Sequence, residues 1–453
     1  MNLRPGQLLS LRANDLNDIG QGVGRIDNMV VFVDGLLPDE EAEVEITLVK
    51  KNYATAVIRR ITTPSVQRVI PQCPTYPQCG GCQVSHLSYQ GQLAYKESKV
   101  RKALTRIGGL QLDERVFKPI VPSNPFGYRN KAQYPVDTID EKIVMGFYER
   151  DSHRIIPCID CPPQHPLSAR LVQVLPGILQ HLGISCYDQK TGSGLIRHAV
   201  SRVSFSHNEL LLVLVVNSPK PLPRKEQLTR QLRRAIPELV GIVQNVNIDN
   251  TNRILGQQSF LLDGRDHIFE KLGTYEFIIS ATSFFQINPL QARRLYDTVK
   301  DAIEPSTKTV VDAYCGTGTI GIYVSDQVQK VIGIEEHPSS ILDALRNAKH
   351  NQVDNCQFHT GKVERILPTL LPREHVDLLL VDPPRRGCAP EVIDALLHNN
   401  IPNLIYVSCN PASLARDLSY LTQGGYQVQR VVPVDMFPQT SHVECVVLIA
   451  KTG

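Results

Sequence analysis

The glycine-rich stretch of residues 309–321, TVVDAYCGTGTIG, constrains the fold of this chain more than any other part. An apolar run ends at Asp312, the chain turns through Gly316 and Gly318, and an apolar helix begins at Thr319. This order of strand, glycine loop and helix opens a doubly wound α/β domain. Glycines let a ligand approach the backbone, and a helix N-terminus offers unpaired N–H groups. We therefore expect the loop to bind the adenosine end of a cofactor.

The glycine spacing alone leaves two enzyme classes open. Gly316-x-Gly318-x-x-Gly321 fits the dinucleotide fingerprint of nicotinamide oxidoreductases. The same loop also suits the cofactor of a methyltransferase. The rest of the chain has to decide between them.

Length and composition indicate a multidomain protein without a membrane partner. A chain of 453 residues is long for one core, so two or three domains are expected. No apolar run approaches membrane-spanning length, and the N-terminus has no signal-peptide core, so we predict a cytoplasmic protein. Eleven cysteines without a secretion signal favour metal or thiolate chemistry over disulfides.

The first two thirds of the chain divide into two predicted parts. Residues 1–62 consist of short alternating strands and turns, which predict a small OB-like β-barrel, a shape often used to bind nucleic acid. Residues 63–265 predict a mixed α/β central domain with a helix over 224–235, and they show no catalytic spacing.

A cysteine cluster lies in a Pro/Gly-rich loop near the start of this central domain. Cys73-x5-Cys79-x2-Cys82 indicates a metal site, since three thiolates this close rarely occur by coincidence. Cys158 and Cys161 offer further ligands. The spacing permits either a zinc site of Cys79, Cys82 and the later pair, or a [4Fe–4S] cluster of the first three cysteines and one later one.

Two basic segments follow the cluster loop. Residues 92–107 have helical spacing and many cations, for which we expect a solvated face, and this helix is a candidate to pack on the catalytic domain. Residues 126–134 place Phe126, Tyr128 and Tyr134 among cations. Such aromatics either stack on single-stranded RNA or pack at a strand edge.

Residues 266–453 carry polar side chains at the ends of several apolar runs. One strand ends at Glu335, where an acid would bind ribose hydroxyls, and the next at Asp382-Pro383-Pro384. Cys409 directly follows a third apolar run and is a candidate nucleophile. Glu444 lies inside an apolar strand, where a carboxylate is costly unless it is paired or functional.

These motifs resemble those of a known enzyme family. DAYCGTGTIG, VIGIE, VDPPRRG, VSCNPASLARDL and DMFPQTSHVECV, in this order, look like the S-adenosylmethionine-dependent RNA (uracil-5-)-methyltransferases. The N-terminal segment resembles the RNA-binding TRAM barrel, and with CPTYPQCGGC it is similar to the subgroup that acts on 23S ribosomal RNA. The resemblance implies a class I (Rossmann-like) methyltransferase domain at the C-terminus.

The resemblance also implies roles for individual residues. S-adenosylmethionine would be bound by Gln286, Tyr314, Glu335 and Asp382. Cys409 would be the nucleophile and Glu444 the general base. A [4Fe–4S] cluster would be held by Cys73, Cys79, Cys82 and Cys161.

The chemistry explains why a thiol and a carboxylate are needed. Uracil C5 becomes a nucleophile only after a thiolate adds at C6, and a base must then remove the C5 proton. We therefore predict a lowered pKa for Cys409, and a flipped or single-stranded uridine that stacks on Phe284. No protein partner is implied. The alternatives are the same chemistry on tRNA, a non-catalytic ribosomal-RNA-binding factor, and a nicotinamide oxidoreductase.

Overall fold

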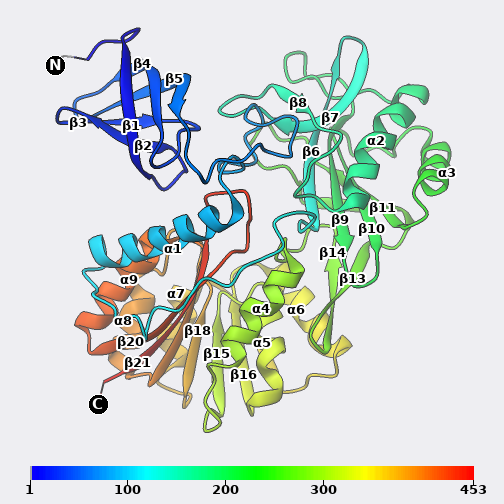
Figure 1. The fold of residues 1–453 in the computed structure, drawn as a ribbon. Coiled ribbons are helices and arrows are strands. Elements are labelled where there is room, and N and C mark those ends of the chain that lie inside the picture. Colours follow the sequence, from blue (N-terminus) through cyan, green and yellow to red (C-terminus); the bar gives the residue numbers. More distant parts are fainter. Residues whose placement is uncertain (1–2, 453) are drawn as a thin grey trace.

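The computed structural model describes residues 3–452, and its N-terminal part is a closed five-stranded barrel (Figure 1). The strands neighbour one another in the order β1-β2-β3-β5-β4. Buried side chains alternate with more exposed ones along β4, so that Ala42, Val44 and Ile46 fill the barrel core. The barrel predicted from the sequence is confirmed. Its strands are β1 (Leu8–Leu16), β2 (Gly22–Ile26), β3 (Met29–Val33), β4 (Glu41–Val49) and β5 (Tyr53–Thr63).

A seven-stranded sheet forms the central part, with the strand order β12-β11-β10-β9-β6-β7-β8. Strand β10 is apolar on both faces, because Leu212 packs with helices α2 and α3 while Leu211 and Val213 join a core shared with the C-terminal part. The sequence predicted α3 but missed α2, whose prolines at its start and at Pro176 obscure a helical reading. These elements are β6 (Lys131–Ile139), β7 (Lys142–Tyr148), β8 (Ile155–Pro157), α2 (Pro166–His181), β9 (Ile196–Ser204), β10 (Glu209–Val216), α3 (Lys225–Ala235), β11 (Leu239–Val246) and β12 (Gln258–Gly264).

The C-terminal part is a second seven-stranded sheet, with the order β17-β16-β15-β18-β19-β21-β20 and helices on both faces (Figure 1). Six strands run in the same direction, and β21 inserts antiparallel between β19 and β20. The strand order reverses between β15 and β18, which places a ligand crevice at the carboxyl ends of these strands. The strands are β15 (Thr309–Ala313), β16 (Lys330–Glu335), β17 (Cys356–Thr360), β18 (Leu378–Val381), β19 (Asn403–Ser408), β20 (Tyr426–Val434) and β21 (Glu444–Lys451).

A hairpin and a set of helices surround this sheet. The hairpin of β13 (His267–Leu272) and β14 (Tyr275–Ser280) precedes it in the chain. The helices are α4 (Pro289–Lys300), α5 (Thr319–Val324), α6 (Pro338–His350), α7 (Val363–Leu370), α8 (Pro390–Asn399) and α9 (Pro411–Gln423). Within residues 3–452, no helix combines the length and the apolar character needed to cross a bilayer.

Helix α1 (Tyr89–Arg106) comes from the central segment of the chain but packs on α9 and β20 of the C-terminal part. Its apolar stripe supplies Val100 and Leu104 to the core there. The prediction of a solvated cationic face is wrong for Lys96, whose side chain is 0% exposed and pairs with Asp435. The sequence could not reveal this pair, because its partners lie far apart in the chain.

Candidate active site

The predicted site residues of the C-terminal part lie at the edge formed by the carboxyl ends of its parallel strands. Glu335 is the last residue of β16, Asp382 follows β18, and Cys409 follows β19. Glu444 begins β21, and because β21 runs antiparallel to β19, its first residue lies at the same edge. The pairing of Ser408 with Cys445 puts Cys409 next to Glu444 across the two strands.

Burial gives the two carboxylates at this edge unusual proton affinities. Glu444 is 4% exposed, and its burial, together with the charge of Asp382, raises its pKa to about 8. Burial raises the pKa of Asp382 to about 7. The cation of Arg385 acts in the opposite direction on Glu444. Two carboxyls with raised pKa values beside a cysteine are typical of a functional site.

The prediction of a lowered pKa for Cys409 is wrong for the free protein. Burial, with the nearby Glu444 and Asp382 carboxylates, raises the pKa of the Cys409 thiol to about 11, and Arg385 only partly offsets this. The prediction rested on the reaction's need for a thiolate, whereas the fold places two acids beside the sulfur.

The glycine loop has a strained backbone conformation and is hydrogen-bonded to Glu335. Tyr314, Gly316 and Gly318 all adopt positive φ angles of 67°, 54° and 74°. Such a conformation is costly for a tyrosine, and strained residues of this kind cluster at ligand sites. The Gly316 N–H donates to Glu335 Oε2 at 3.2 Å, and the His337 N–H donates to Oε1 at 2.9 Å. The half-buried Glu335 carboxylate therefore closes one side of the loop.

Asp312 belongs to the same loop but was not singled out from the sequence. Its side chain is 1% exposed, and its Oδ2 accepts a hydrogen bond of 2.9 Å from the Gly321 N–H. Its Oδ1 has no hydrogen-bond partner, and burial raises its pKa to about 7. An acid at the end of an apolar strand, directly before the glycines, was the available signal.

The loop that carries Phe284 and Gln286 is fixed from the central part. The buried Arg202 guanidinium donates to the carbonyls of Ala281 and Ser283, at 3.0 and 2.5 Å. The Asn130 amide donates to the Gln286 carbonyl at 3.0 Å. Phe284 remains 64% exposed, so its ring is free to contact a ligand.

Two of the three aromatics predicted to stack on RNA are core residues. Tyr128 and Tyr134 are each 1% exposed, and the Tyr128 hydroxyl donates to the Pro438 carbonyl at 2.9 Å. The stacking hypothesis is therefore wrong for both, and the alternative of packing holds. Tyr134 lies in β6, where period-2 alternation decides which side chains face inward, and Tyr128 is buried by its tertiary contact with Pro438; composition alone reveals neither.

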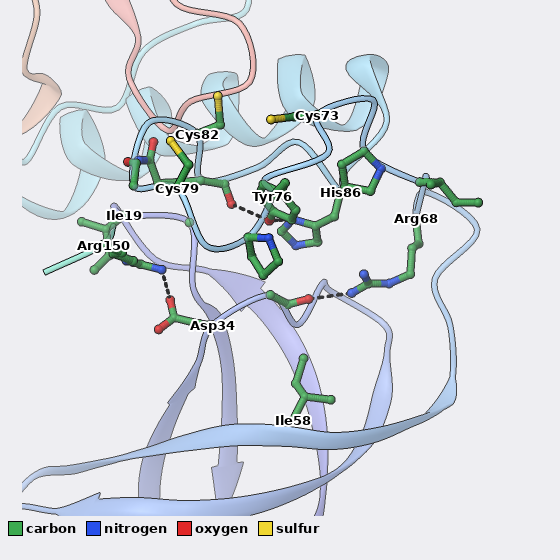
Figure 2. A pocket seen from close by; sticks show the side chains of 17 residues that line it. Ile19, Asp34, Ile58, Arg68, Cys73, Tyr76, Cys79, Cys82, His86 and Arg150 are labelled. Atoms are coloured by element: carbon green, nitrogen blue, oxygen red, sulfur yellow. Dashed lines mark hydrogen bonds and ion pairs between the residues drawn. The ribbon is translucent and has the colours of Figure 1, made fainter. Parts of the chain in front are cut away.

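Five cysteines line one cavity of about 360 Å³. Cys73, Cys79 and Cys82 lie on the loop next to the barrel (Figure 2), where this loop also borders a second cavity of about 590 Å³. A hydrogen bond to Cys158 raises the pKa of Cys73, and a hydrogen bond to Cys161 raises the pKa of Cys158 to about 12. In the described part of the chain, no three Cys, His, Asp or Glu side chains are arranged to hold one metal ion.

The raised pKa of Glu444 predicts how stability depends on pH. The folded protein keeps this proton up to about pH 8, whereas the unfolded chain releases it near pH 4.5. The contribution of the protonated Glu444 side chain to the free energy of unfolding is fully present below pH 4.5 and is lost as the pH rises to 8. Glu444→Gln should therefore stabilise the fold relative to wild type increasingly between these pH values, by roughly a few kcal/mol at pH 8 and above. Thermal unfolding of both proteins from pH 5 to 9 measures this, and a constant difference would contradict it.

Comparisons with known proteins agree with this architecture. Residues 88–452 match the family described as tRNA (Uracil-5-)-methyltransferase, and residues 4–58 match the TRAM domain. A protein of Clostridium tetani named as an uncharacterized RNA methyltransferase is 40% identical over 436 residues, which cover 96% of this chain and 94% of that one. A Bacillus cereus protein of the same description is 41% identical over 439 residues, covering 96% and 95%.

A solved structure resembles the whole chain. It is the tRNA (uracil-54, C5)-methyltransferase of Pyrococcus abyssi in complex with S-adenosyl-L-homocysteine, with a TM-score of 0.78 and 28% identity. The match covers 97% of this chain and 99% of that one. The chain therefore belongs to the tRNA (uracil-5-)-methyltransferase family and is an S-adenosylmethionine-dependent RNA methyltransferase.

Proposed function

We propose that this enzyme transfers a methyl group from S-adenosylmethionine to C5 of a uridine in 23S ribosomal RNA, through a covalent bond between Cys409 and C6. The observation that carries the proposal is the pairing of β19 with β21, which sets a cysteine and a buried glutamate side by side at the ligand crevice. A nicotinamide oxidoreductase has no use for this pair.

The two side chains divide the chemistry between them. Once the Cys409 thiol has lost its proton to solvent, its sulfur forms a bond to C6, and the electron pair moves to C5. C5 then takes the methyl group, and the sulfonium of S-adenosylmethionine leaves as a neutral thioether. The Glu444 carboxylate accepts the C5 proton, the C5–C6 double bond re-forms, and the S–C6 bond breaks. Product and thiolate are released together.

The raised pKa values of Cys409 and Glu444 mean that both groups must lose a proton before they can react. With pKa values of about 11 and 8, Cys409 and Glu444 are mostly neutral at pH 7 in the free protein. A positively charged sulfonium placed near Asp382 would favour the ionised form of both groups, as a nearby cation does for any acid. The cofactor would thus prepare the thiolate that the free protein does not hold.

The residues proposed to bind the cofactor are those that the family resemblance implies, and their positions near the glycine loop support this proposal. Glu335 would bind the ribose hydroxyls, and Tyr314 would contact the cofactor from its strained position. Asp382 and Gln286 would approach it from the end of β18 and from the loop before α4. Phe284 would stack on the target base after it leaves its helix.

The second candidate substrate is tRNA. The Pyrococcus abyssi enzyme is named for its action on tRNA, and its match spans 97% of this chain, so that the N-terminal barrel does not separate the two substrates. What supports 23S ribosomal RNA is the resemblance of the barrel and the CPTYPQCGGC loop to that subgroup.

The test uses purified protein, labelled S-adenosylmethionine, and equal amounts of 23S ribosomal RNA and tRNA transcripts. We expect label in 5-methyluridine of the ribosomal RNA. Label in tRNA alone would support the proposed reaction but show that the substrate is tRNA. Absence of label in both would favour the RNA-binding factor without catalysis.

The thiols that line the cysteine cavity are the type of ligand that a [4Fe–4S] cluster takes. A four-iron cluster takes each thiolate on a different iron, so its ligands need not converge on one point as those of a single ion must. Cys73, Cys79, Cys82 and Cys161 would be these ligands. The cavity also contains Arg129, whose buried Nε has no hydrogen-bond partner and which could face an anionic cluster. The methyl transfer needs no electrons, so the cluster would stabilise the loop.

Removing single cysteines tests this assignment. Protein purified without oxygen should contain about four iron atoms per chain. Cys161→Ala should lower the iron content and the stability, whereas the matched Cys158→Ala should retain the iron. Equal iron content in both variants would refute the assignment of Cys161. Zinc in place of iron would favour the zinc site formed by Cys79, Cys82, Cys158 and Cys161.

A further inference from the structure

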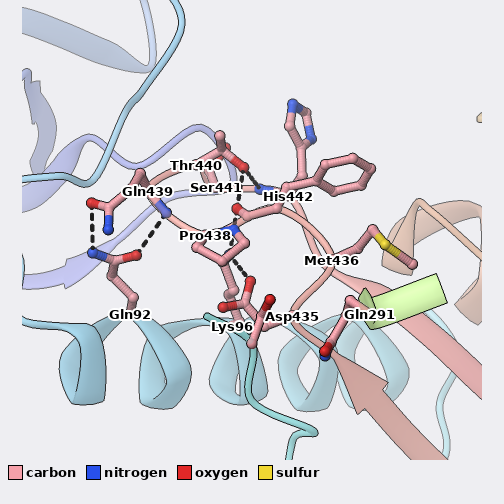
Figure 3. Close-up of polar contacts among 12 residues, drawn as sticks. Gln92, Lys96, Gln291, Asp435, Met436, Pro438, Gln439, Thr440, Ser441 and His442 are labelled. Carbon is pink, nitrogen blue, oxygen red and sulfur yellow. Dashed lines mark hydrogen bonds and ion pairs between the residues drawn. The ribbon is translucent and has the colours of Figure 1, made fainter. Parts of the chain in front are cut away.

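One face of α1 contacts residues 435–441, which make up most of the loop between β20 and β21 (Figure 3). Tyr89, Gln92, Lys96 and Lys99 are three or four residues apart, so they lie on one side of the helix. Each of them donates at least one hydrogen bond to this loop. The contacted part of the loop ends three residues before Glu444.

The centre of this contact is a buried ion pair. Lys96 Nζ donates to Asp435 Oδ1 at 2.5 Å and to the Phe437 carbonyl at 2.9 Å, and both charged side chains are 0% exposed. The Tyr89 hydroxyl donates to the second oxygen of Asp435 at 2.9 Å. A buried pair of this kind adds little net stability compared with apolar residues of similar size. Its value lies in fixing one geometry, since Lys96 Nζ and both Asp435 oxygens are held by directional hydrogen bonds inside the protein.

The remaining contacts hold the rest of the loop in the same way. The Gln92 and Gln439 residues exchange two hydrogen bonds, of 2.9 and 3.2 Å. Lys99 Nζ donates to the Ser441 carbonyl at 2.9 Å. The N–H groups of Gln83 and Val84, directly after Cys82, both donate to the Gln439 carbonyl at 3.1 Å. The loop is therefore tied to the helix along its length and to the cysteine loop at its middle.

We propose that Lys96 and Asp435 are positioning residues for methyl transfer, which hold the β20–β21 loop so that Glu444 reaches the C5 proton of the target base. This inference rests on the proposed function, because it gives Glu444 the role of base. Neither Lys96 nor Asp435 needs to contact substrate. The pair would act on one step, the loss of the C5 proton, and not on cofactor binding.

The test compares Lys96→Met, the double variant Lys96→Met/Asp435→Asn, and Glu444→Gln. Lys102→Met is the matched control, because Lys102 lies on the same helix and pairs with Asp15 of the barrel. The double variant removes the charge that Lys96→Met leaves unpaired, so it remains decisive if the single variant unfolds. Each protein is assayed for turnover, for KM of S-adenosylmethionine, for thermal unfolding, and for RNA that stays bound to protein under denaturing conditions.

We expect both Lys96 variants to lose turnover on the order of 100-fold, as for a displacement of about 1 Å at a catalytic group, with KM unchanged. Because the C5 proton is then lost slowly, the methylated RNA–protein adduct should accumulate as in Glu444→Gln. Lys102→Met should behave as wild type.

Two results would overturn the inference but leave the proposed function intact. The first is a folded double variant with wild-type turnover. The second is that the Lys96 variants are slow but accumulate no RNA–protein adduct, while Glu444→Gln does accumulate the adduct. A wild-type protein without methyl transfer, together with Glu444→Gln without adduct, would overturn the proposed function and the inference with it.

Discussion

Replacing Cys409 by alanine should lower methyl transfer to RNA by at least about 10⁴-fold, because it removes the thiol that forms the bond to C6. The neighbouring Cys445 is 0% exposed and lies within β21, so it cannot take over this role. S-adenosylmethionine should still bind, since Cys409 is not among the residues assigned to it. Radiolabel transfer to RNA and calorimetric titration with the cofactor measure the two effects separately.

Cys186→Ala is the matched control for this variant. Cys186 is also half-buried, and burial raises the pKa of its thiol, but it lies in the central part of the chain. We expect this variant to keep the wild-type rate. A Cys409→Ala protein that still methylates RNA within tenfold of wild type would refute the covalent mechanism and leave the family assignment intact.

The raised pKa of Cys409 has its own measurable consequence. In the free protein the thiol should react slowly with iodoacetamide at pH 7, because its pKa of about 11 leaves little thiolate. We expect cofactor binding to speed this reaction, since a sulfonium charge lowers the pKa of nearby acids.

Local signals in the sequence were enough to predict where three of the candidate site residues lie in the fold. Asp382, Cys409 and Glu444 each stand where an apolar run begins or ends, and strand ends of a doubly wound sheet meet at one edge. Their strand positions could be predicted because β-strands in such sheets are short and almost entirely apolar. A small N-terminal barrel was predicted from alternation and turns, and the structure gives it five strands.

The features that the sequence did not reveal are those that depend on contacts between residues far apart in the chain. The burial of Lys96 requires Asp435, and the burial of Tyr128 requires the Pro438 carbonyl. The pKa of Cys409 depends on Asp382 and on Glu444, which belong to other strands. A single sequence gives the periodicity of each element, but it does not say which elements meet.

Replacing Glu444 by glutamine should stop the reaction after methyl transfer. The amide has nearly the same shape, so Cys409 can still add to C6 and C5 can still be methylated, but the carboxylate that takes the C5 proton is gone. We expect turnover to fall by about 10²–10⁴-fold, the usual share of a general base, while RNA stays attached to the protein on a denaturing gel.

Glu270→Gln is the matched control for this variant. Glu270 is 1% exposed with a raised pKa, and its carboxylate accepts hydrogen bonds from the Phe205 and Ser206 N–H groups, away from the crevice. It should lose stability without trapping RNA. The kcat/KM of the wild type should also rise with pH through about 8, as the Glu444 carboxyl loses its proton in the free protein. A Glu444→Gln protein that turns over freely, or that is slow without any trapped RNA, would assign the base to another residue, and Asp382 would be the next candidate because it shares the same edge of the sheet.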